Sequence, residues 1–291
     1  MPELPEVHTT VEGLKTVIIG KTITDAWSDF HIGSAHGDRQ TIKNKKYFER
    51  FKKLVIGSTI NNLERRGKHI LIHLNPPAGG GAFTIIVHMK MTGCLMYKKS
   101  KTEKYVHFVL SFKSGDFLLL SDLRKFASVS IVETNDLGSH DAAKLGPDAL
   151  DPKLSAKKLF EMVGERKNTP IKSALLDQKI IAGIGNIYSD EILWTSGIHP
   201  LSRADKVPKK KFDEIFKNMQ RILKFSIKHG GDSKSDYRNA FGEKGGFQNF
   251  HQVYGKKKER CQKKGCSGII ERTVVRGRSA HFCPKHQKIY L

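Results

Sequence analysis

The sequence predicts a multidomain α+β fold with three parts: a β-rich N-terminal half that follows a first helix, a helical segment, and a small cysteine-rich tail. Short β-branched and aromatic runs recur from about Thr22 to Glu133, which is typical of strands. Apolar residues then recur at helical spacing, and three of the four cysteines lie near the end of the chain. We place the three parts at residues 1–150, 151–250 and 251–291.

The opening segment, MPELPEV, begins an amphipathic helix. Pro5 falls in the expected first turn, where its missing N–H is harmless, and Gly20 follows the expected end. The chain is therefore expected to be ordered from its first residues. Apolar side chains at steps of three and four mark the buried face of this helix, namely Val7, Val11, Leu14 and Ile18.

Short runs of β-branched and aromatic residues follow, separated by turn sequences such as KSGD at 113–116. Strands of this length and spacing favour a sandwich or a barrel. The predicted strands lie within 56–67, 69–74, 83–91, 105–112, 116–122 and 128–133.

Beyond residue 150 the pattern changes to helical periodicity, with a long apolar stripe between Phe212 and Ile227. Residues 228–260 are rich in Gly, Lys and polar side chains, so we interpret them as a loop or linker. The predicted helices lie within 154–163, 171–179, 186–197 and 210–230.

Charge is the outlying property of the composition. The chain has 51 Lys+Arg against 29 Asp+Glu, a formal net charge of +22 and a pI near 9.8. Cations that neutralise phosphates release condensed counterions, so this balance favours a nucleic-acid partner over a merely lysine-rich surface. No run approaches the roughly 20 apolar residues of a membrane span, and no signal peptide is recognisable. We expect an intracellular protein without a membrane partner, in the bacterial cytoplasm near the nucleoid or in a eukaryotic nucleus.

The tail carries the spacing Cys261-x4-Cys266-x16-Cys283-x2-His286. Four Cys or His ligands at such spacing are typical of a closed, tetrahedral zinc site, which stabilises a segment too short to build a core. We expect one structural zinc ion, with His281 as a competing fourth ligand and three free thiols as the alternative.

The stretch IIAGIGNIY (180–188) lies between two predicted helices. Its two glycines permit a tight turn, and Asn186 is expected to cap the second helix. A helix N-terminus presents N–H groups to an anion, and in so basic a chain that anion is expected to be a DNA phosphate. The alternative is a plain packing corner between helices.

Together these segments resemble the formamidopyrimidine-DNA glycosylase/endonuclease VIII family over nearly the whole chain. The resemblance implies an N-terminal β-sandwich, a helix-two-turn-helix domain and a C-terminal β-hairpin zinc finger. The opening MPELPE is closer to the formamidopyrimidine branch. The motifs that carry the resemblance are MPELPEV, RRGKHIL (65–71), HMKMTG (88–93), DLRKF (122–126), KLGPDAL (144–150), 175–200 and GRSAHFCPKH (277–286).

The family resemblance implies a bifunctional glycosylase and apurinic/apyrimidinic (AP) lyase that acts as a monomer on double-stranded DNA with oxidised bases or abasic sites. Removal of Met1 leaves Pro2 with a secondary amine, whose pKa lies near that of α-amino groups, about 7.7–8.0, and which can attack a sugar C1′. Glu3 matches the family's proton donor and Glu6 a supporting acid. Lys68 matches a lysine that assists base release and β-elimination, and Arg278 a finger arginine that assists δ-elimination.

The resemblance also assigns residues to the DNA. A damaged base must leave the stack before attack, and side chains then fill the gap. Met91, Arg124 and Phe126 match the family's three inserting residues, and Asn186 its phosphate-binding asparagine. Tyr105 stands where the family usually has a DNA-contacting histidine, with His107 two residues later.

Three departures accompany these matches: the fourth metal ligand is His286 where Cys is usual, the first cysteine pair is spaced by four residues, and position 125 is Lys where Arg is usual. They bear on zinc affinity and on lesion preference. Two other functions stay open, an endonuclease VIII-like glycosylase for oxidised pyrimidines and a non-catalytic damaged-DNA-binding protein. Simple binding has no need of Pro2, Glu3 and Lys68.

Overall fold

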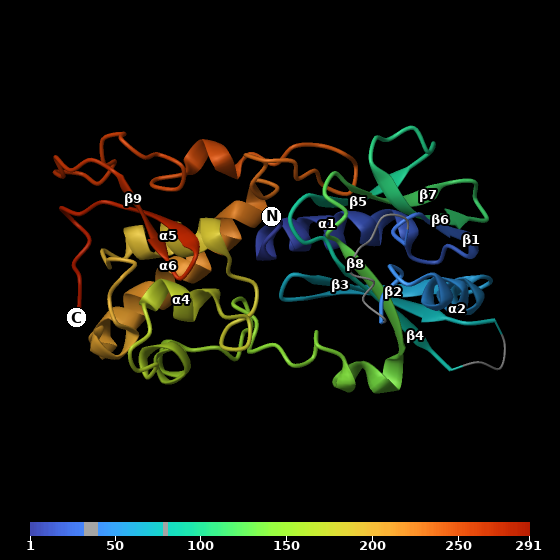
Figure 1. The fold of residues 1–291 in the computed structure, drawn as a ribbon, viewed down its shortest axis with the longest axis horizontal. Helices are drawn as coiled ribbons and strands as arrows, with labels where there is room; N and C mark the ends of the chain where they lie inside the picture. Colours follow the sequence, from blue (N-terminus) through green and yellow to red (C-terminus); the bar gives the residue numbers. More distant parts are fainter. Residues whose placement is uncertain (32–39, 78–80) are drawn as a thin grey trace. The chain divides into compact units, whose positions relative to one another are not determined.

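The computed structural model describes residues 1–31, 40–77 and 81–291, which divide into two compact units (Figure 1). Unit 1 comprises Met1–Lys144 and His229–Gly246, and unit 2 comprises Leu145–Lys228 and Phe247–Leu291. Residues 229–246, interpreted from sequence as linker, thus belong to unit 1. The finer division into three domains stays a prediction.

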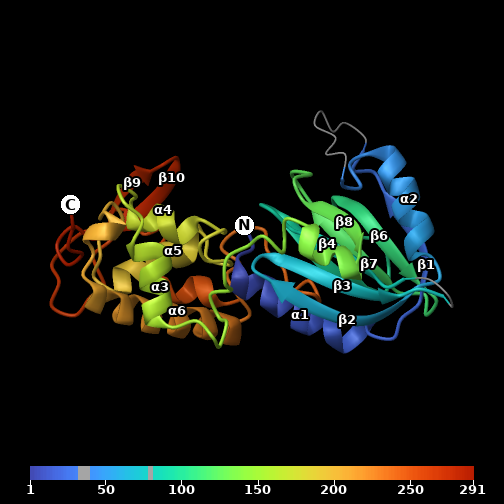
Figure 2. The same cartoon turned by 90° about the horizontal axis from the view of Figure 1, so that it is seen from below.

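Unit 1 is built on two four-stranded antiparallel sheets (Figure 2). Neighbouring strands run antiparallel throughout, which fits short connections between them. The first sheet has the order β1 (Ile23–Ser28), β6 (Val106–Phe112), β7 (Phe117–Asp122), β5 (Gly93–Lys98). The second has the order β2 (Thr59–Arg66), β3 (His69–Asn75), β4 (Phe83–His88), β8 (Ser128–Glu133), after which a 3₁₀ segment spans Thr134–Ser139.

Helix α1 (Leu4–Ile18) packs against β2 of one sheet and β5 of the other. Its predicted face, from Val7 to Ile18, joins a single hydrophobic core to which both sheets contribute. Alternation along the strands directs one set of side chains into this core. The predicted β-sandwich with a flanking N-terminal helix is confirmed.

One helix was not expected. Residues predicted only to contain strands include α2 (Lys45–Val55), which packs against β1. Asn44 caps it by accepting the N–H of Tyr47 at 3.1 Å, and Phe48, Phe51 and Val55 form its buried face at helical spacing. Strands β1 and β5 were also missing from the predicted set.

Unit 2 gathers short helices around α5. Helix α5 packs against α4, α6 and β10, and the small hairpin of β9 and β10 is the one expected near the cysteines. All four predicted helical stretches are helical. The elements are α3 (Ala156–Leu159), which continues as a π-helical turn over Phe160–Gly164, α4 (Ile171–Leu176), α5 (Asn186–Thr195), α6 (Lys209–Lys228), 3₁₀ segments at Ala204–Lys206 and Phe247–Phe250, β9 (Glu271–Val275) and β10 (Arg278–Phe282).

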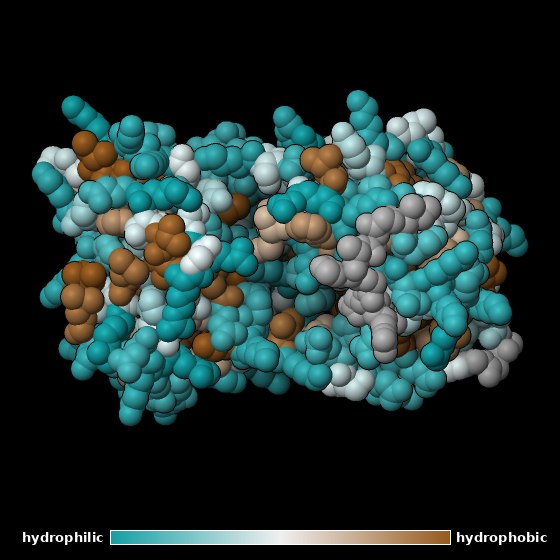
Figure 3. Space-filling model, in the orientation of Figure 1, coloured by the Kyte–Doolittle hydropathy of each residue, from teal (hydrophilic) through white to brown (hydrophobic). Residues whose placement is uncertain are grey.

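The face drawn in Figure 3 is mostly hydrophilic, with separate apolar patches between polar side chains. Such a surface agrees with the excess of Lys and Arg in the composition. Within 1–31, 40–77 and 81–291, no helix has the length and apolar character needed to cross a membrane.

Candidate functional site

The start of α1 holds three of the predicted site residues. Glu3 is the N-cap: its backbone N–H donates to Glu6 Oε2 at 2.7 Å, and its carboxylate accepts the N–H of Glu6. This reciprocal capping box satisfies donors that a helix start leaves open. Pro2 is buried, and Glu3 and Glu6 are each only 1% exposed. The backbone that carries Pro2 is therefore held in one conformation.

The segment His229–Gly246, here called the return segment, secures the same turn from outside the helix. Glu6 Oε1 accepts the N–H of Asp232 at 2.7 Å, and the Tyr237 hydroxyl donates to the Glu6 carbonyl oxygen at 2.8 Å. Burial raises the pKa of Tyr237, so the hydroxyl stays a donor. Gly231 has φ +81°, and a Cβ there would lie 2.9 Å from Glu6 Oε1. The side chain of Glu6 thus joins two chain segments that are distant in sequence.

Lys68 lies in a different element from the one predicted. The sequence places it on a strand, but it occupies the two-residue turn between β2 and β3, after Gly67 with φ +57°. It is nonetheless 6% exposed. Beside it His69 and His88 face each other across the strands with ring centroids 4.5 Å apart, and burial lowers the pKa of His69 to about 4. The lysine therefore lies next to uncharged imidazoles at neutral pH.

The three predicted inserting residues lie in two turns that share one carboxylate. Met91 lies between β4 and β5, and the Arg124 guanidinium lies 4.4 Å from the ring centroid of Phe126, which is 47% exposed. Asp122, fully buried, accepts the Thr92 hydroxyl and the N–H of Ala127, the latter at 2.7 Å. The structure brings these two turns together, and sequence reasoning missed Asp122 as their link.

Tyr105 and His107, predicted together as DNA contacts, have different surroundings. Tyr105 is 55% exposed with φ +56°, and its carbonyl oxygen accepts the N–H of Asp122 at 2.9 Å. The His107 side chain is 12% exposed and lies 2.8 Å from Asp29 Oδ1. Only Tyr105 presents most of its side chain to solvent.

In unit 2 the glycine turn precedes α5 as expected, but Asn186 is not the cap. Gly185 is the N-cap and Asn186 the first helical residue, so the expected capping role of Asn186 was wrong. Its Nδ2 donates instead to the Ser279 hydroxyl at 3.2 Å. Gln178 braces the turn by accepting the N–H of Gly183 at 2.9 Å and donating to the Ile184 carbonyl oxygen at 2.8 Å.

Arg278 is exposed at the first position of β10, after a turn in which Arg276 and Gly277 both have positive φ. Such angles are typical of tight hairpins. The hairpin is fixed to α5 by Asp190, which binds Lys172 through one carboxylate oxygen and accepts the His281 N–H at 2.9 Å through the other. Asn186 and Arg278 are thus carried by elements that contact each other, since the neighbour of Arg278, Ser279, binds Asn186.

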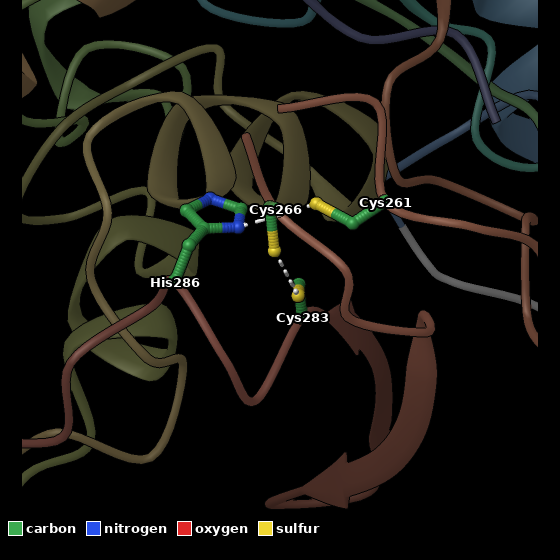
Figure 4. A group of neighbouring side chains, drawn as sticks. All are labelled: Cys261, Cys266, Cys283 and His286. Carbon is green, nitrogen blue, oxygen red and sulfur yellow. Dashed lines mark hydrogen bonds between the residues drawn. The ribbon is translucent and has the colours of Figure 1, made fainter. Parts of the chain in front are cut away.

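The predicted metal ligands converge in the tail (Figure 4). The ligand atoms of Cys261, Cys266, Cys283 and His286 all lie within 4.8 Å of one another. Cys266 Sγ is 3.7 Å from Cys283 Sγ, and Cys261 Sγ is 3.2 Å from His286 Nδ1. In a tetrahedral zinc site with bonds of about 2.3 Å to sulfur and 2.0–2.1 Å to nitrogen, those separations are about 3.8 Å and 3.6 Å. The four groups therefore fit a metal ion.

The surroundings of His286 support it as the fourth ligand. Its Nε2 lies 3.0 Å from the Trp194 carbonyl oxygen. That oxygen accepts a hydrogen bond from Nε2–H in the tautomer that leaves the Nδ1 lone pair free to bind a metal. Burial lowers the pKa of His286, which favours the neutral, ligating form. His281, the competing candidate, lies elsewhere against Asp190.

The carboxylate of Glu191 holds the backbone of residues 252–254, which precede the first cysteine of this cluster. Glu191, 2% exposed, accepts the N–H groups of Gln252, Val253 and Tyr254 at 2.9–3.0 Å. Val253 and Trp194 pack with the cysteines in one small apolar cluster. Three convergent N–H groups satisfy a buried carboxylate, so Glu191 is explained by folding alone.

Comparison with known proteins agrees with these features. Residues 1–129 match the family model for the formamidopyrimidine-DNA glycosylase N-terminal domain, and residues 145–238 match the model for its H2TH domain. Formamidopyrimidine-DNA glycosylases from Bacillus licheniformis and Streptococcus pneumoniae strain R6 are 36% and 34% identical to this chain. The first alignment covers 99% of this chain and 100% of that protein, and the second 99% of both.

Solved structures with the same fold include complexes of Lactococcus lactis Fpg with DNA. A mutant Fpg in complex with Fapy-dG DNA matches with a TM-score of 0.85 and 31% identity, over 99% of this chain and 100% of that one. A complex with abasic-site DNA matches with a TM-score of 0.85 and 31% identity, over 98% and 99%. By identity and coverage over both units, this chain belongs to the formamidopyrimidine-DNA glycosylase family.

Proposed function

We propose that this chain is a bifunctional DNA glycosylase and AP lyase of base excision repair, acting as a monomer on double-stranded DNA that contains oxidised bases or abasic sites. The observation that carries the proposal is the ordered start of α1, where Pro2 is followed by two buried, mutually bonded glutamates. Family membership supports it. The Bacillus licheniformis relative is named formamidopyrimidine-DNA glycosylase, and the matched Lactococcus lactis structures hold Fapy-dG and abasic-site DNA.

The chemistry begins at Pro2 once Met1 has been removed. The secondary amine has a pKa near 7.7–8.0 in general, so a usable fraction is neutral at pH 7. That amine attacks C1′ of the damaged nucleotide, the C1′–base bond breaks, and an iminium forms between Pro2 and the opened sugar. A chain that kept Met1 would have an amide at this nitrogen and no nucleophile.

Glu3 and Lys68 handle the protons of this step. Glu3 donates a proton as the base departs and the sugar ring opens. Its position at the helix start suits this role, because the residue is only 1% exposed to solvent. Glu6 fixes the orientation of Glu3 through the capping box. Lys68, with little solvent around it, assists base release and the following β-elimination. Arg278 binds the phosphate and assists δ-elimination, so the strand is cut on both sides of the lost base.

Attack on C1′ requires the damaged base to leave the stack, at a cost of a few kcal/mol. Met91, Arg124 and Phe126 fill the gap from their two joined turns. Asn186 and the N–H groups at the start of α5 bind backbone phosphate, and Tyr105 contacts the backbone from unit 1. The net charge of +22 supplies long-range attraction to the duplex.

One zinc ion is proposed as a structural cofactor held by Cys261, Cys266, Cys283 and His286. With four protein ligands it has no open position for substrate, and it stabilises the tail that carries Arg278. This assignment suits a hairpin whose own apolar cluster is small.

The substrates are oxidised purines, 8-oxoguanine and formamidopyrimidines. An oxidised-pyrimidine preference is a second candidate, favoured by one observation: a wild-type Lactococcus lactis Fpg, matched with a TM-score of 0.84, was solved with DNA containing an oxidised pyrimidine. A panel of duplexes that differ only in the lesion separates the two.

Borohydride trapping tests the nucleophile. The mature chain is incubated with a duplex carrying 8-oxoguanine opposite cytosine and reduced with borohydride, which converts the iminium to a stable amine. We expect a covalent adduct that is lost in Pro2→Gly at comparable DNA affinity. Glu6→Gln, which keeps the oxygen that accepts from Asp232, serves as a matched variant and should retain part of the adduct. Absence of adduct with the wild-type chain, or an undiminished adduct with Pro2→Gly, would refute the assignment.

A further inference from the structure

Asp29, the residue that follows β1, binds two other elements of unit 1 through one carboxylate. Oδ1 lies 2.8 Å from His107 Nδ1 in β6, and Oδ2 accepts the Lys125 ammonium at 3.2 Å. The Asp29 side chain is 24% exposed and that of Lys125 35%. The pair is thus partly shielded from water, and partial shielding strengthens an ion pair relative to a fully solvated one.

Lys125 lies between the two inserting side chains of its turn. Its φ is +54°, a left-handed conformation that residues with a Cβ rarely adopt. The turn is held through a side chain and through its backbone. Asp29 binds the side chain of Lys125. The Lys43 ammonium donates to the backbone carbonyl oxygens of Lys125 and Phe126 at 3.1 and 3.3 Å. Arg124 and Phe126 flank the strained residue, so its conformation sets their directions.

Hydrogen bonds and packing hold the backbone at Asp29 in place. Its N–H donates to the His107 carbonyl oxygen at 3.2 Å, and the preceding Ser28 hydroxyl donates to the same oxygen at 2.8 Å. The following Phe30 is 1% exposed, and its ring meets the His107 ring edge-on at 5.6 Å. A carboxylate on so constrained a backbone can position a partner, because it gives up little freedom when the ion pair forms.

We infer that Asp29 is a positioning residue that holds the turn Asp122–Phe126 in the shape from which Arg124 and Phe126 enter the duplex, with Lys125 and His107 as its two contacts. The inference rests on the proposed function. It also gives His107 a role in supporting this turn. It accounts for Lys at position 125 as well, since the Lys125 ammonium reaches both the Asp29 carboxylate and, at 3.5 Å, the Asp29 carbonyl oxygen.

The test compares duplex with single-stranded substrates. Asp29→Asn keeps an oxygen for His107 but removes the charge that binds Lys125. We expect kcat/KM on an abasic-site duplex to fall about 3- to 5-fold, the size set by a partly exposed ion pair. Cleavage of the same abasic oligonucleotide as a single strand should stay within about twofold of wild type, because no stack has to be opened there. A 2-aminopurine beside the lesion should also report a slower fluorescence rise in the duplex.

Asp25→Asn is the matched control, because Asp25 lies on the same β1 and forms an ion pair with Lys52 at 2.7 Å, away from the turn. It should match wild type on both substrates, and Asp29→Glu, which keeps the charge, should recover most of the duplex activity. If Asp29→Asn fails to fold, Lys125→Gln removes the same ion pair from its more exposed partner. Equal losses on duplex and single strand, or no difference from Asp25→Asn, would overturn the positioning role while leaving the proposed function intact. A wild-type chain that cleaves neither substrate would overturn both.

Discussion

Replacing Asp190 tests whether a buried ion pair holds the hairpin of unit 2. The side chains of Lys172 and Asp190 are both 0% exposed, and the second carboxylate oxygen accepts the His281 N–H at 2.9 Å. Asp190→Ala leaves a buried ammonium without its carboxylate. Breaking a buried pair from one side costs about 3–5 kcal/mol, because the remaining charge has lost its counter-charge and is shielded from water.

A double substitution separates the charge from the hydrogen bond. In Lys172→Met/Asp190→Ala no unpaired charge of the pair remains. The His281 backbone N–H and Nδ1 lose Asp190 Oδ2, as they also do in Asp190→Ala, at a cost of about 1–3 kcal/mol for each group left unsatisfied. The double variant should therefore be more stable than Asp190→Ala alone, with a coupling free energy of about 2 kcal/mol between the two sites.

The assay uses the two tryptophans of the chain, Trp27 in unit 1 and Trp194 in unit 2. In a Trp27→Phe background, fluorescence during urea unfolding reports unit 2 alone, so the two units need not unfold together. Glu214→Ala, which removes an exposed i,i+3 pair with Lys211, is the control and should cost less than about 1 kcal/mol. A loss for Asp190→Ala no larger than this control, or a double variant no more stable than Asp190→Ala, would refute the reasoning.

Two further predictions concern metal and pH. Elemental analysis should find one zinc per chain, and His286→Ala should lose both the zinc and DNA affinity. Trp194 emission should also change in this variant, since the Trp194 and His286 rings lie 5.0 Å apart. If His286→Ala retained zinc and bound DNA as tightly as wild type, the ligand set would be contradicted. Burial, together with the charge of Lys90, lowers the pKa of His69 from 6.5 to about 4. As the pH drops from 6.5 to 4, the unfolded chain protonates this imidazole before the folded chain does. The free energy of unfolding therefore falls over this range, by at most about 3 kcal/mol. Burial also lowers the pKa of the neighbouring His88, so His69→Phe should reduce that slope and leave part of it in urea unfolding followed through Trp27. Equal acid slopes in both proteins would count against the buried, neutral imidazole of His69.

The sequence alone predicted most of the elements and much of the site's chemistry. The apolar periodicity of α1 and α6, the strand runs of β2, β3, β4, β6, β7 and β8 and the spacing of the cysteines are local patterns. Local patterns report the side-chain period and the candidate ligands directly. The residue types at Pro2, Glu3 and Lys68 also stand in the sequence as candidates for amine and proton chemistry.

Tertiary structure decided what holds those residues in place. Residues 229–246 resemble a linker because they are rich in Gly and polar residues. Asp232 and Tyr237 nevertheless bind Glu6 across more than two hundred positions of sequence. Lys68 is buried although it lies in a turn, and Asn186 binds Ser279 where its residue type suggested a cap. Asp29 lies in no motif, and Asp122 begins the motif DLRKF, which does not indicate that its carboxylate joins two turns. Their roles depend on which strands pair and which turns meet, and long-range pairing of this kind leaves no periodic trace in the chain.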